Sequence, residues 1–287
     1  MSIDLFQDKI RKTKNPSVLC IEAFCELTPP LYRKEELSAV DAFEVYCVDV
    51  LEAIAKLIPA VRFGFGSFAV LGAEGLSALH RLMQTAYEKG FYVLLDAPEQ
   101  LSSMTAAHTA KALSDETRYP CHGFVVNGYL GSDVLKPFVA LCKEGRSLFP
   151  VVRTANKSAS ELQDLLTGSR LVHTAAADIV NRLGEQFTTR CGYSQVGALG
   201  AASAADSLRA LRSKYKRLFL LLDGYDYPNA NAKNCSFAFD NLGHGAAACA
   251  GVSVLGAWQE EAGDPVASAV QSAERMKKNL TRYVAVL

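Results

Sequence analysis

The sequence lacks the patterns that would assign it to a membrane, to nucleic acid or to a secretory route. Its 30 acidic and 30 basic side chains cancel among 287 residues, so no excess of charge indicates nucleic acid or an anionic lipid surface as a partner. No apolar run reaches the ~18–20 residues that a bilayer-spanning helix needs. Residues 1–12 have an amphipathic helical pattern that includes acidic side chains, which is atypical of a signal peptide. We therefore expect a cytoplasmic protein with no membrane and no nucleic-acid partner.

Metal-ligand spacing is also missing. The eight cysteines include no Cys-x-x-Cys pair, and neither they nor the five histidines are spaced as zinc ligands. Cys20, Cys142 and Cys249 lie in apolar runs, which is typical of reduced core thiols in a cytosolic protein. A metal or redox role is the less favoured alternative. We expect no metal and no cofactor.

No linker, charge block or low-complexity tract divides the chain, so we expect a single domain over residues 1–287. Short apolar runs that alternate with helical patterns predict eight strands, at residues 17–21, 60–63, 91–95, 122–126, 148–152, 196–202, 218–222 and 245–255. Eight strands alternating with helices over about 250 residues favour a (β/α)₈ barrel of the α/β class. An open doubly wound sheet is the alternative.

Polar side chains follow several of these predicted strands. Asp96 ends the apolar run at residues 91–95, Glu22 ends the first strand and Asn127 ends the fourth. In a parallel α/β protein the carboxyl ends of the strands carry the functional side chains. The sequence therefore predicts a site at this end of the barrel.

Six segments, in the same order, resemble the longer bacterial type of orotidine 5′-phosphate decarboxylase, a (β/α)₈ enzyme that makes UMP. The first, Asn-Pro-Ser-Val-Leu-Cys-Ile-Glu at residues 15–22, stands where the family has Asn-Pro-Thr-Val-Val-Gly-Leu-Asp. The third, Phe-Val-Val-Asn-Gly-Tyr-Leu-Gly-Ser-Asp at 124–133, parallels Val-Thr-Val-Asn-Pro-Tyr-Leu-Gly-x-Asp. The other four are at residues 72–76, 152–163, 192–198 and 273–280. The resemblance covers nearly the whole chain and implies a role in pyrimidine biosynthesis.

The resemblance also implies where functional groups are replaced. The family's third-strand loop reads Asp-Ala-Lys-Arg-Gly-Asp, and its lysine protonates C6 of the pyrimidine. This chain keeps Asp96 but has Pro98 at the lysine position and Leu101 at the second aspartate position. Arg62 replaces the lysine of strand two, and Val252 replaces the arginine that grips phosphate. We therefore predict that decarboxylase chemistry is lost or strongly reduced.

Candidate site residues follow from these positions. We assign Asp96 and Arg62 as the candidate catalytic residues. The candidate substrate-binding residues are Glu22, Asn127, Arg153, Thr154 and Tyr225. The expected ligand is a nucleotide or another small phosphorylated molecule, and the family implies a homodimer.

For several of these residues a structural role competes with a functional one. Arg62 and Glu22 are expected to form an ion pair across adjacent strand ends, the alternative being a catalytic acid–base couple. Asp96 is either a ligand-binding carboxylate or a helix cap. The polar loop at residues 223–234 is either an ordered surface loop or a site for a cation or polyol. Gly64 suggests close backbone packing or a remodelled pocket.

Three hypotheses remain open. The first, which we favour, is a decarboxylase-like barrel that serves as a binding or regulatory module or runs a different reaction. The second is an active decarboxylase in which Glu99, Arg62 or a partner-chain residue substitutes for the lysine. The third is a structural partner of an authentic decarboxylase paralogue.

Overall fold

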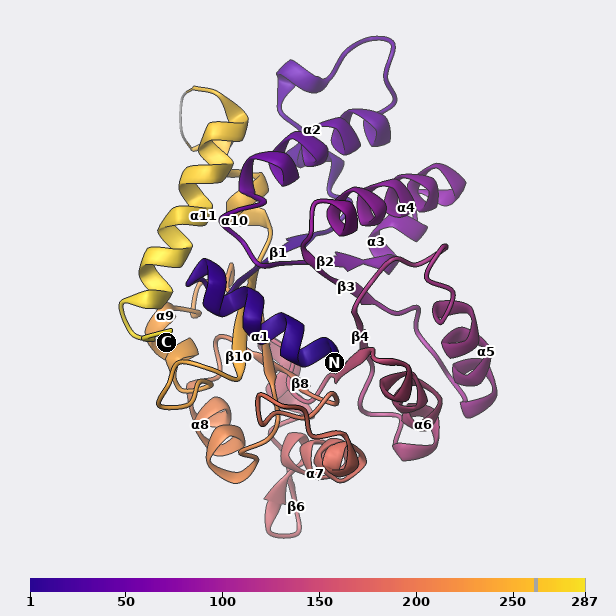
Figure 1. Ribbon diagram of the computed structural model, residues 1–287, viewed down its shortest axis with the longest axis vertical. Coiled ribbons are helices and arrows are strands. Elements are labelled where there is room, and N and C mark those ends of the chain that lie inside the picture. Colours follow the sequence, from indigo (N-terminus) through magenta and orange to yellow (C-terminus); the bar gives the residue numbers. More distant parts are fainter. Residues whose placement is uncertain (261–262, 287) are drawn as a thin grey trace.

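The computed structural model describes residues 1–260 and 263–286, and its centre is a parallel β-barrel (Figure 1). Within the described residues the sheet has eight strands in the order β5-β4-β3-β2-β1-β10-β9-β8. These strands are β1 (Ser17–Ile21), β2 (Ala60–Gly64), β3 (Tyr92–Asp96), β4 (Gly123–Val126), β5 (Ser147–Pro150), β8 (Ala198–Ala201), β9 (Leu220–Asp223) and β10 (Ala246–Ala250). The prediction of a (β/α)₈ barrel is confirmed, and the open sheet is wrong.

Backbone hydrogen bonds between the two ends of this sheet close the barrel. The N–H groups of Leu148 and Val152 donate to the carbonyls of Gln195 and Leu199, each at 2.9 Å. The N–H of Gly197 returns a bond of 2.8 Å to the carbonyl of Leu148. These bonds leave neither β5 nor β8 as an open edge, which removes a route to aggregation.

Helices surround the barrel and follow the strands in sequence. They are α1 (Ser2–Thr13), α2 (Ala39–Ile54), α3 (Phe65–Ala69), α4 (Gly72–Glu88), α5 (Ser103–Leu113), α6 (Ser132–Ala140), α7 (Val172–Gly184), α8 (Ala205–Lys214), α9 (Ala232–Ser236), α10 (Val252–Leu255) and α11 (Pro265–Thr281). Among the residues described, no helix has the length and apolar character needed to cross a membrane.

The strands alternate their side chains between two apolar layers, as the period of two requires. One layer packs between the strands and the helices and includes Leu19, Val61 and Leu95. The other fills the barrel interior and includes Ala60, Leu94, Phe149, Leu199, Phe219, Leu221 and Cys249.

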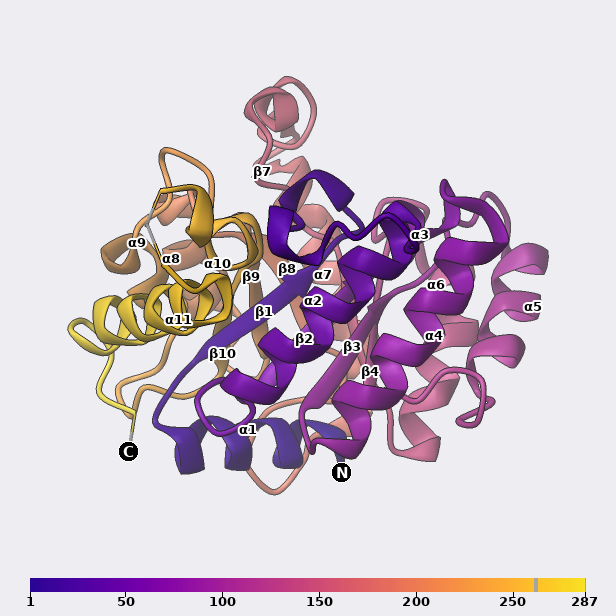
Figure 2. The same cartoon turned by 90° about the horizontal axis from the view of Figure 1, so that it is seen from above.

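Helix α1 lies across the end of the barrel where the strands begin, as Figures 1 and 2 show. Its Phe6 ring stacks on Tyr92 of β3, with 4.3 Å between the ring centroids, and on Phe219 just before β9 at 5.0 Å. The rings of Phe6, Tyr92 and Phe219 form an aromatic plug that fills the barrel at the end where the strands begin. The barrel interior therefore has room for a cavity only towards the carboxyl ends of the strands.

Two predicted elements differ from the structure. The last strand, predicted to reach residue 255, ends at Ala250, and residues 252–255 form the short helix α10. The second is a helical stretch that the sequence pattern predicts to start at residues 160–166. The chain there forms a 3₁₀ turn, Lys157–Glu161, followed by a hairpin of β6 (Leu166–Thr167) and β7 (Arg170–Leu171). Gly168 makes this hairpin possible, because it turns the chain with φ of 64°.

Candidate functional site

Arg62 is the centre of a polar layer at the carboxyl ends of the strands. Ala60 and Leu94 face the barrel interior, so the period of two directs Arg62 and Asp96 inwards, one step nearer the mouth. The Arg62 guanidinium donates to both carboxylate oxygens of Asp96, from Nε at 2.6 Å and from Nη2 at 2.7 Å. Its Nη1 donates to Asp223 Oδ1, at the end of β9, at 2.5 Å. One guanidinium thus ties β2 to β3 and, across the barrel, to β9.

The charge on Arg62 is fixed by these two partners. Burial opposes the charge, but Asp96 and Asp223 outweigh that effect and raise the pKa of Arg62 well above its ordinary value. Only 10% of the Arg62 side chain is exposed, against 25% for Asp96 and 34% for Asp223. Arg62 is therefore a permanent cation that cannot act as a proton donor.

Glu22 reaches into the same layer because Gly64 leaves room for it. A Cβ atom at Gly64 would lie 2.1 Å from Glu22 Oε2 and 2.5 Å from its Oε1. Close packing of the backbone at Gly64, one of the two expectations for this glycine, is therefore present. Burial raises the pKa of the Glu22 carboxyl, and the nearby Asp96 charge raises it further.

The predicted ion pair between Arg62 and Glu22 is wrong. Register leaves both carboxylates within reach of Arg62, because Cys20 and Leu94 pair with Arg62, and Glu22 and Asp96 each follow by two residues. The Glu22 carboxylate lies next to Gly64. The guanidinium turns instead to Asp96 on the opposite neighbour of β2 and to Asp223. Asp96 is not the cap of α5 either, because Ser102 forms the capping box of that helix with Thr105.

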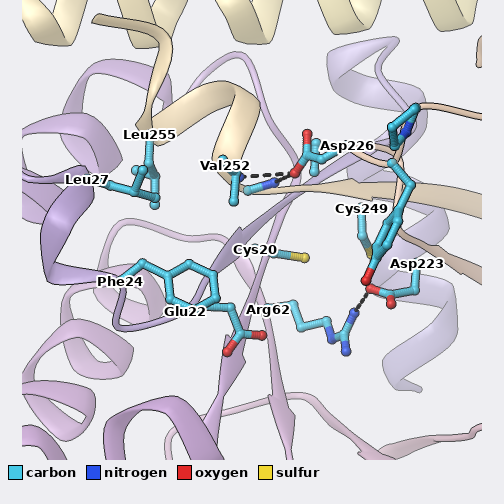
Figure 3. A pocket seen from close by; sticks show the side chains of 15 residues that line it. Cys20, Glu22, Phe24, Leu27, Arg62, Asp223, Asp226, Cys249, Val252 and Leu255 are labelled. Atoms are coloured by element: carbon cyan, nitrogen blue, oxygen red, sulfur yellow. Dashed lines mark hydrogen bonds and ion pairs between the residues drawn. The ribbon is translucent and has the colours of Figure 1, made fainter. Parts of the chain in front are cut away.

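A cavity of about 420 Å³ opens above this layer (Figure 3). Glu22, Arg62 and Asp223 form its polar side, while Phe24, Leu27 and Leu255 contribute apolar surface. The remaining lining residues are Cys20, Gly224, Asp226, Tyr227, Pro228, Cys249, Ala250, Gly251 and Val252. We call this cavity the mouth pocket. Its volume is within the range of small-molecule sites, ~300–1,000 Å³.

The thiol of Cys20 also faces the mouth pocket, close to Cys249 (Figure 3). A hydrogen bond with Cys249 and burial together raise the pKa of Cys20 well above its usual value. The Cys20 thiol therefore stays protonated and is a poor nucleophile.

On one wall of the mouth pocket the Asp226 side chain caps the short helix α10. The Asp226 carboxylate accepts hydrogen bonds from the backbone N–H groups of Gly251 at 2.7 Å, Val252 at 3.0 Å and Ser253 at 3.4 Å. These are the N–H groups at the start of α10, where no carbonyl of the helix itself is available. Figure 3 shows Asp226 on the side of the pocket away from Glu22.

The other predicted site residues lie outside the mouth pocket. Asn127 faces Glu99 across 3.5 Å in a small crevice under the third-strand loop. Arg153 is held by both oxygens of Asp164, each at 2.9 Å, and borders a second depression of about 780 Å³. The structure thus brings Arg62, Asp96 and Glu22 together but separates them from Asn127 and Arg153.

Thr154 and Tyr225 have local partners. The Thr154 N–H donates a hydrogen bond to Gln163 Oε1 at 2.8 Å, and the Thr154 hydroxyl donates one to Asn156 Oδ1 at 2.6 Å. The Tyr225 N–H donates to the carbonyl of Cys249 at 3.1 Å, and burial raises the pKa of its phenol to about 12. Tyr225 borders a separate depression beside α11.

Asp223 and Asp226 belong to the loop at residues 223–234, the alternative cation or polyol site, but neither was named as a catalytic or substrate-binding residue. Asp223 ends an apolar run, as Asp96 does, so the same signal identifies it. Asp226 carries no comparable signal, because its N–H partners come 25 to 27 residues later in the chain. Within the described part of the chain no group of three or more His, Cys, Asp or Glu side chains is placed to hold a metal ion.

Comparisons with known proteins show what this chain is similar to. No protein-family model matches the chain. An orotidine 5′-phosphate decarboxylase of Rhodopirellula baltica is 29% identical over 220 residues, covering 75% of this chain and 72% of its own. One of Clostridium acetobutylicum is 26% identical over 263 residues and covers 91% of each chain.

Solved structures give the same fold. A putative orotidine-monophosphate decarboxylase from Toxoplasma gondii superposes with a TM-score of 0.81 at 18% identity, covering 98% of both chains. A putative orotidine 5′-phosphate decarboxylase from Streptomyces avermitilis gives 0.79 at 21% identity, covering 99% of this chain and 95% of its own. The chain is therefore a homologue of the orotidine 5′-phosphate decarboxylases and shares their barrel.

Proposed function

We propose that this protein is a small-molecule-binding barrel of decarboxylase descent in which the decarboxylation of orotidine 5′-phosphate is lost or strongly reduced. The observation that carries the proposal is the ion pairing of Arg62, the cation of the mouth pocket, with both Asp96 and Asp223. No lysine is present among the described residues that line the mouth pocket.

The chemistry explains why this matters. Breaking the bond between C6 and the carboxylate leaves an electron pair at C6, which a nearby cation must stabilise and a proton must then quench. Two carboxylates already neutralise the Arg62 cation, and the raised pKa of Arg62 keeps its protons on the guanidinium. Pro98, at the lysine position, has neither charge nor proton. The decarboxylation needs an acceleration towards the upper part of the ~10⁶–10¹⁷ range, which these groups do not supply.

One observation favours a second candidate, an active decarboxylase with displaced groups. Glu22 lines the mouth pocket, and its raised pKa keeps a proton on the carboxyl to a higher pH than usual. Glu99, the alternative substitute, is exposed and faces Asn127 outside the pocket. If the reaction survives, Glu22 is therefore the acid that replaces the lysine.

The deciding experiment is decarboxylation of orotidine 5′-phosphate by the purified protein, followed by loss of orotate-ring absorbance. An authentic decarboxylase runs beside it. We expect no turnover at high protein concentration. Clear turnover overturns the proposal, and the matched variants Glu22→Gln and Glu99→Gln then identify the acid. Loss of activity in the first variant alone supports the second candidate.

We also propose a homodimer, as the family resemblance implies. Leu101 and Met104, in and after the third-strand loop, are 91% and 74% exposed, and Val70 after α3 is 83% exposed. Apolar side chains this open to water are favourable to cover with a partner chain. A second copy of this chain is the partner we favour; an authentic decarboxylase paralogue is the alternative, and a mixed dimer on co-expression would support it.

A further inference from the structure

A second cavity lies between the loops that follow β5 and β8 and the start of α7. It is the depression of about 780 Å³ that Arg153 borders, and we call it the side pocket. Of the described lining residues, Tyr227 and Pro228 alone border both the side pocket and the mouth pocket. A Cβ atom at Gly224 would lie 2.4 Å from the Cβ of Ala155, so the loop after β9 packs on the loop after β5. This contact divides the two cavities.

Two buried basic side chains line the side pocket and share one carboxylate. Arg153 is 9% exposed, and His173 of α7 is 3% exposed. The Asp164 carboxylate accepts hydrogen bonds from Arg153 Nε and Nη2, each at 2.9 Å, and its Oδ1 lies 3.3 Å from His173 Nδ1. Basic side chains are seldom buried without a partner that holds them. Asp164 therefore fixes both Arg153 and His173 at the wall of the cavity.

Both buried side chains keep hydrogen-bonding capacity that these partners do not use. A guanidinium has five N–H groups, and Arg153 directs three of them to Asp164 and to the carbonyl of Thr154. His173 Nδ1 lies 3.0 Å from the carbonyl oxygen of Gln163. A carbonyl oxygen only accepts, so Nδ1 carries the proton, and the neutral ring has its lone pair on Nε2. Arg153 can therefore donate further hydrogen bonds, and His173 Nε2 can accept one from a hydroxyl group.

Other walls of the side pocket add two donors. Lys157 is exposed and lines the cavity from the loop after β5. Ser207 lines it from α8, and among the described residues its buried hydroxyl has no hydrogen-bond partner. Most buried hydroxyl groups in proteins are paired, so an unpaired one beside a cavity indicates a partner from outside the chain. The Asp206 carboxylate opposes an anion, but its side chain is 96% exposed and pairs with Arg209 at 3.1 Å.

We propose that the side pocket is a second ligand site, which takes a small hydroxylated molecule with one phosphate or carboxylate group. Arg153 and Lys157 hold the anionic group, because guanidinium and ammonium groups form strong charge-assisted hydrogen bonds with such oxygens. Asp164 offsets the charge of Arg153, so Lys157 supplies the net attraction. His173 Nε2 accepts a hydrogen bond from a hydroxyl group of the ligand. The site lies outside the mouth pocket, so the inference does not depend on the loss of decarboxylation.

Titration followed by amide NMR measures the affinity and the place of binding together. The probes are glycerol 3-phosphate, glycerate and glycerol, which are small hydroxylated molecules with a phosphate group, a carboxylate group or neither. The proteins are the wild type, Lys157→Met and His173→Phe. Lys136→Met is the matched control, since Lys136 on α6 is also exposed and does not line the side pocket. The exposed Lys157 variant keeps the test valid if His173→Phe does not fold.

We expect the wild type to bind glycerol 3-phosphate or glycerate at least about tenfold more tightly than glycerol, with amide shifts at residues 153–157 and 203–207. The tighter of the two anionic probes identifies the anionic group as phosphate or carboxylate. Lys157→Met should weaken binding of that probe by about tenfold, because it removes the net attraction, and His173→Phe should weaken it as well. Lys136→Met should bind as the wild type does.

Two results overturn the inference. One is wild-type protein that binds neither anionic probe more tightly than glycerol. The other is binding that Lys157→Met leaves unchanged, or amide shifts that fall on mouth-pocket residues such as Glu22 and Gly251 instead of the side pocket. Failure of the proposed function is detected separately, because turnover of orotidine 5′-phosphate refutes the loss of chemistry whether or not the side pocket binds these probes.

Discussion

Replacing Arg62 by methionine should destabilise the protein strongly, because it leaves Asp96 and Asp223 facing one another without a cation. At an effective dielectric constant of ~20 and a charge separation of ~4 Å, each pair contributes roughly 4 kcal/mol of attraction. The cost of burying Arg62, several kcal/mol, offsets much of that sum. Removing one partner of a buried pair typically costs ~3–5 kcal/mol. Because 34% of Asp223 and 25% of Asp96 are exposed and screened by water, we expect about 3 kcal/mol.

Urea denaturation followed by circular dichroism measures this cost as a free energy of unfolding. Arg81→Met is the matched control, since Arg81 also holds both oxygens of a carboxylate, that of Glu44, but is 51% exposed. We expect the control to lose at most ~1 kcal/mol. Adding Asp96→Asn and Asp223→Asn to Arg62→Met should recover a large part of the loss, because the uncompensated charges are then gone.

The pH dependence provides a further check. Burial raises the pKa of Asp96 in the folded state, and loss of the Arg62 cation, which opposes that effect, raises it further. The folded state of Arg62→Met then binds more protons than the unfolded state, so its stability falls as pH rises through the raised pKa of Asp96. The deficit relative to wild type should therefore be smaller at pH 5 than at pH 8. A loss below about 1 kcal/mol, or no recovery in the triple variant, would refute the role given to Arg62.

Four other perturbations test separate parts of the structure. Gly64→Ala should cost at most about 1 kcal/mol in urea denaturation, because its Cβ would displace the flexible end of the Glu22 side chain, which lies 2.1 Å away, and Glu22→Ala should remove that cost; equal costs in both backgrounds would contradict the contact. Glu22→Gln should be more stable than wild type at pH 8, with the gain shrinking as pH falls through the raised pKa towards 4.5, since the charged form of Glu22 is disfavoured in the folded state. Pro98→Lys should not restore decarboxylation in the absorbance assay, because Leu101 still replaces the second aspartate and Val252 still replaces the arginine; measurable turnover would contradict this prediction. Light scattering should give a dimer for wild type and a shift to monomer for Leu101→Asp, whose wild-type side chain is 91% exposed; a wild-type monomer would refute the dimer.

Most of the barrel was predictable from local patterns. The strand predicted at residues 17–21 has the same bounds in the structure, and the runs at 60–63 and 218–222 differ from β2 and β9 by one or two residues. These runs are short, apolar and bounded by turn or helix signals, so local sequence determines them. The helix at residues 252–255 was not predictable from the local sequence. Their β-branched valines suit a strand, and the helix they form is capped by Asp226 from another loop.

The sequence predicted which residues form the site better than it predicted which of them contact one another. Position at a strand end identified Glu22 and Asp96, and the family resemblance pointed to Arg62. The partner of Arg62 was not predictable, because Glu22 and Asp96, on the strands either side of β2, stand at the same register and strand pairing does not choose between them. The cross-barrel bond to Asp223 joins residues 161 apart. No local pattern specifies a contact of that separation.

The plug formed by α1 has a consequence for how the chain folds. Phe6 of α1 packs on Tyr92 and Phe219, which are synthesised much later than α1. The Gln7 side chain accepts a hydrogen bond from the Gly245 N–H, 238 residues further along the chain. Until β9 and β10 have emerged, the apolar face of α1 lacks its binding surface. Closing such distant contacts slows folding and prolongs the exposure of apolar surface. Residues 2–13 therefore form a helix whose binding surface is complete only once residue 245 has been synthesised, which makes α1 a natural place for a chaperone to hold the nascent protein.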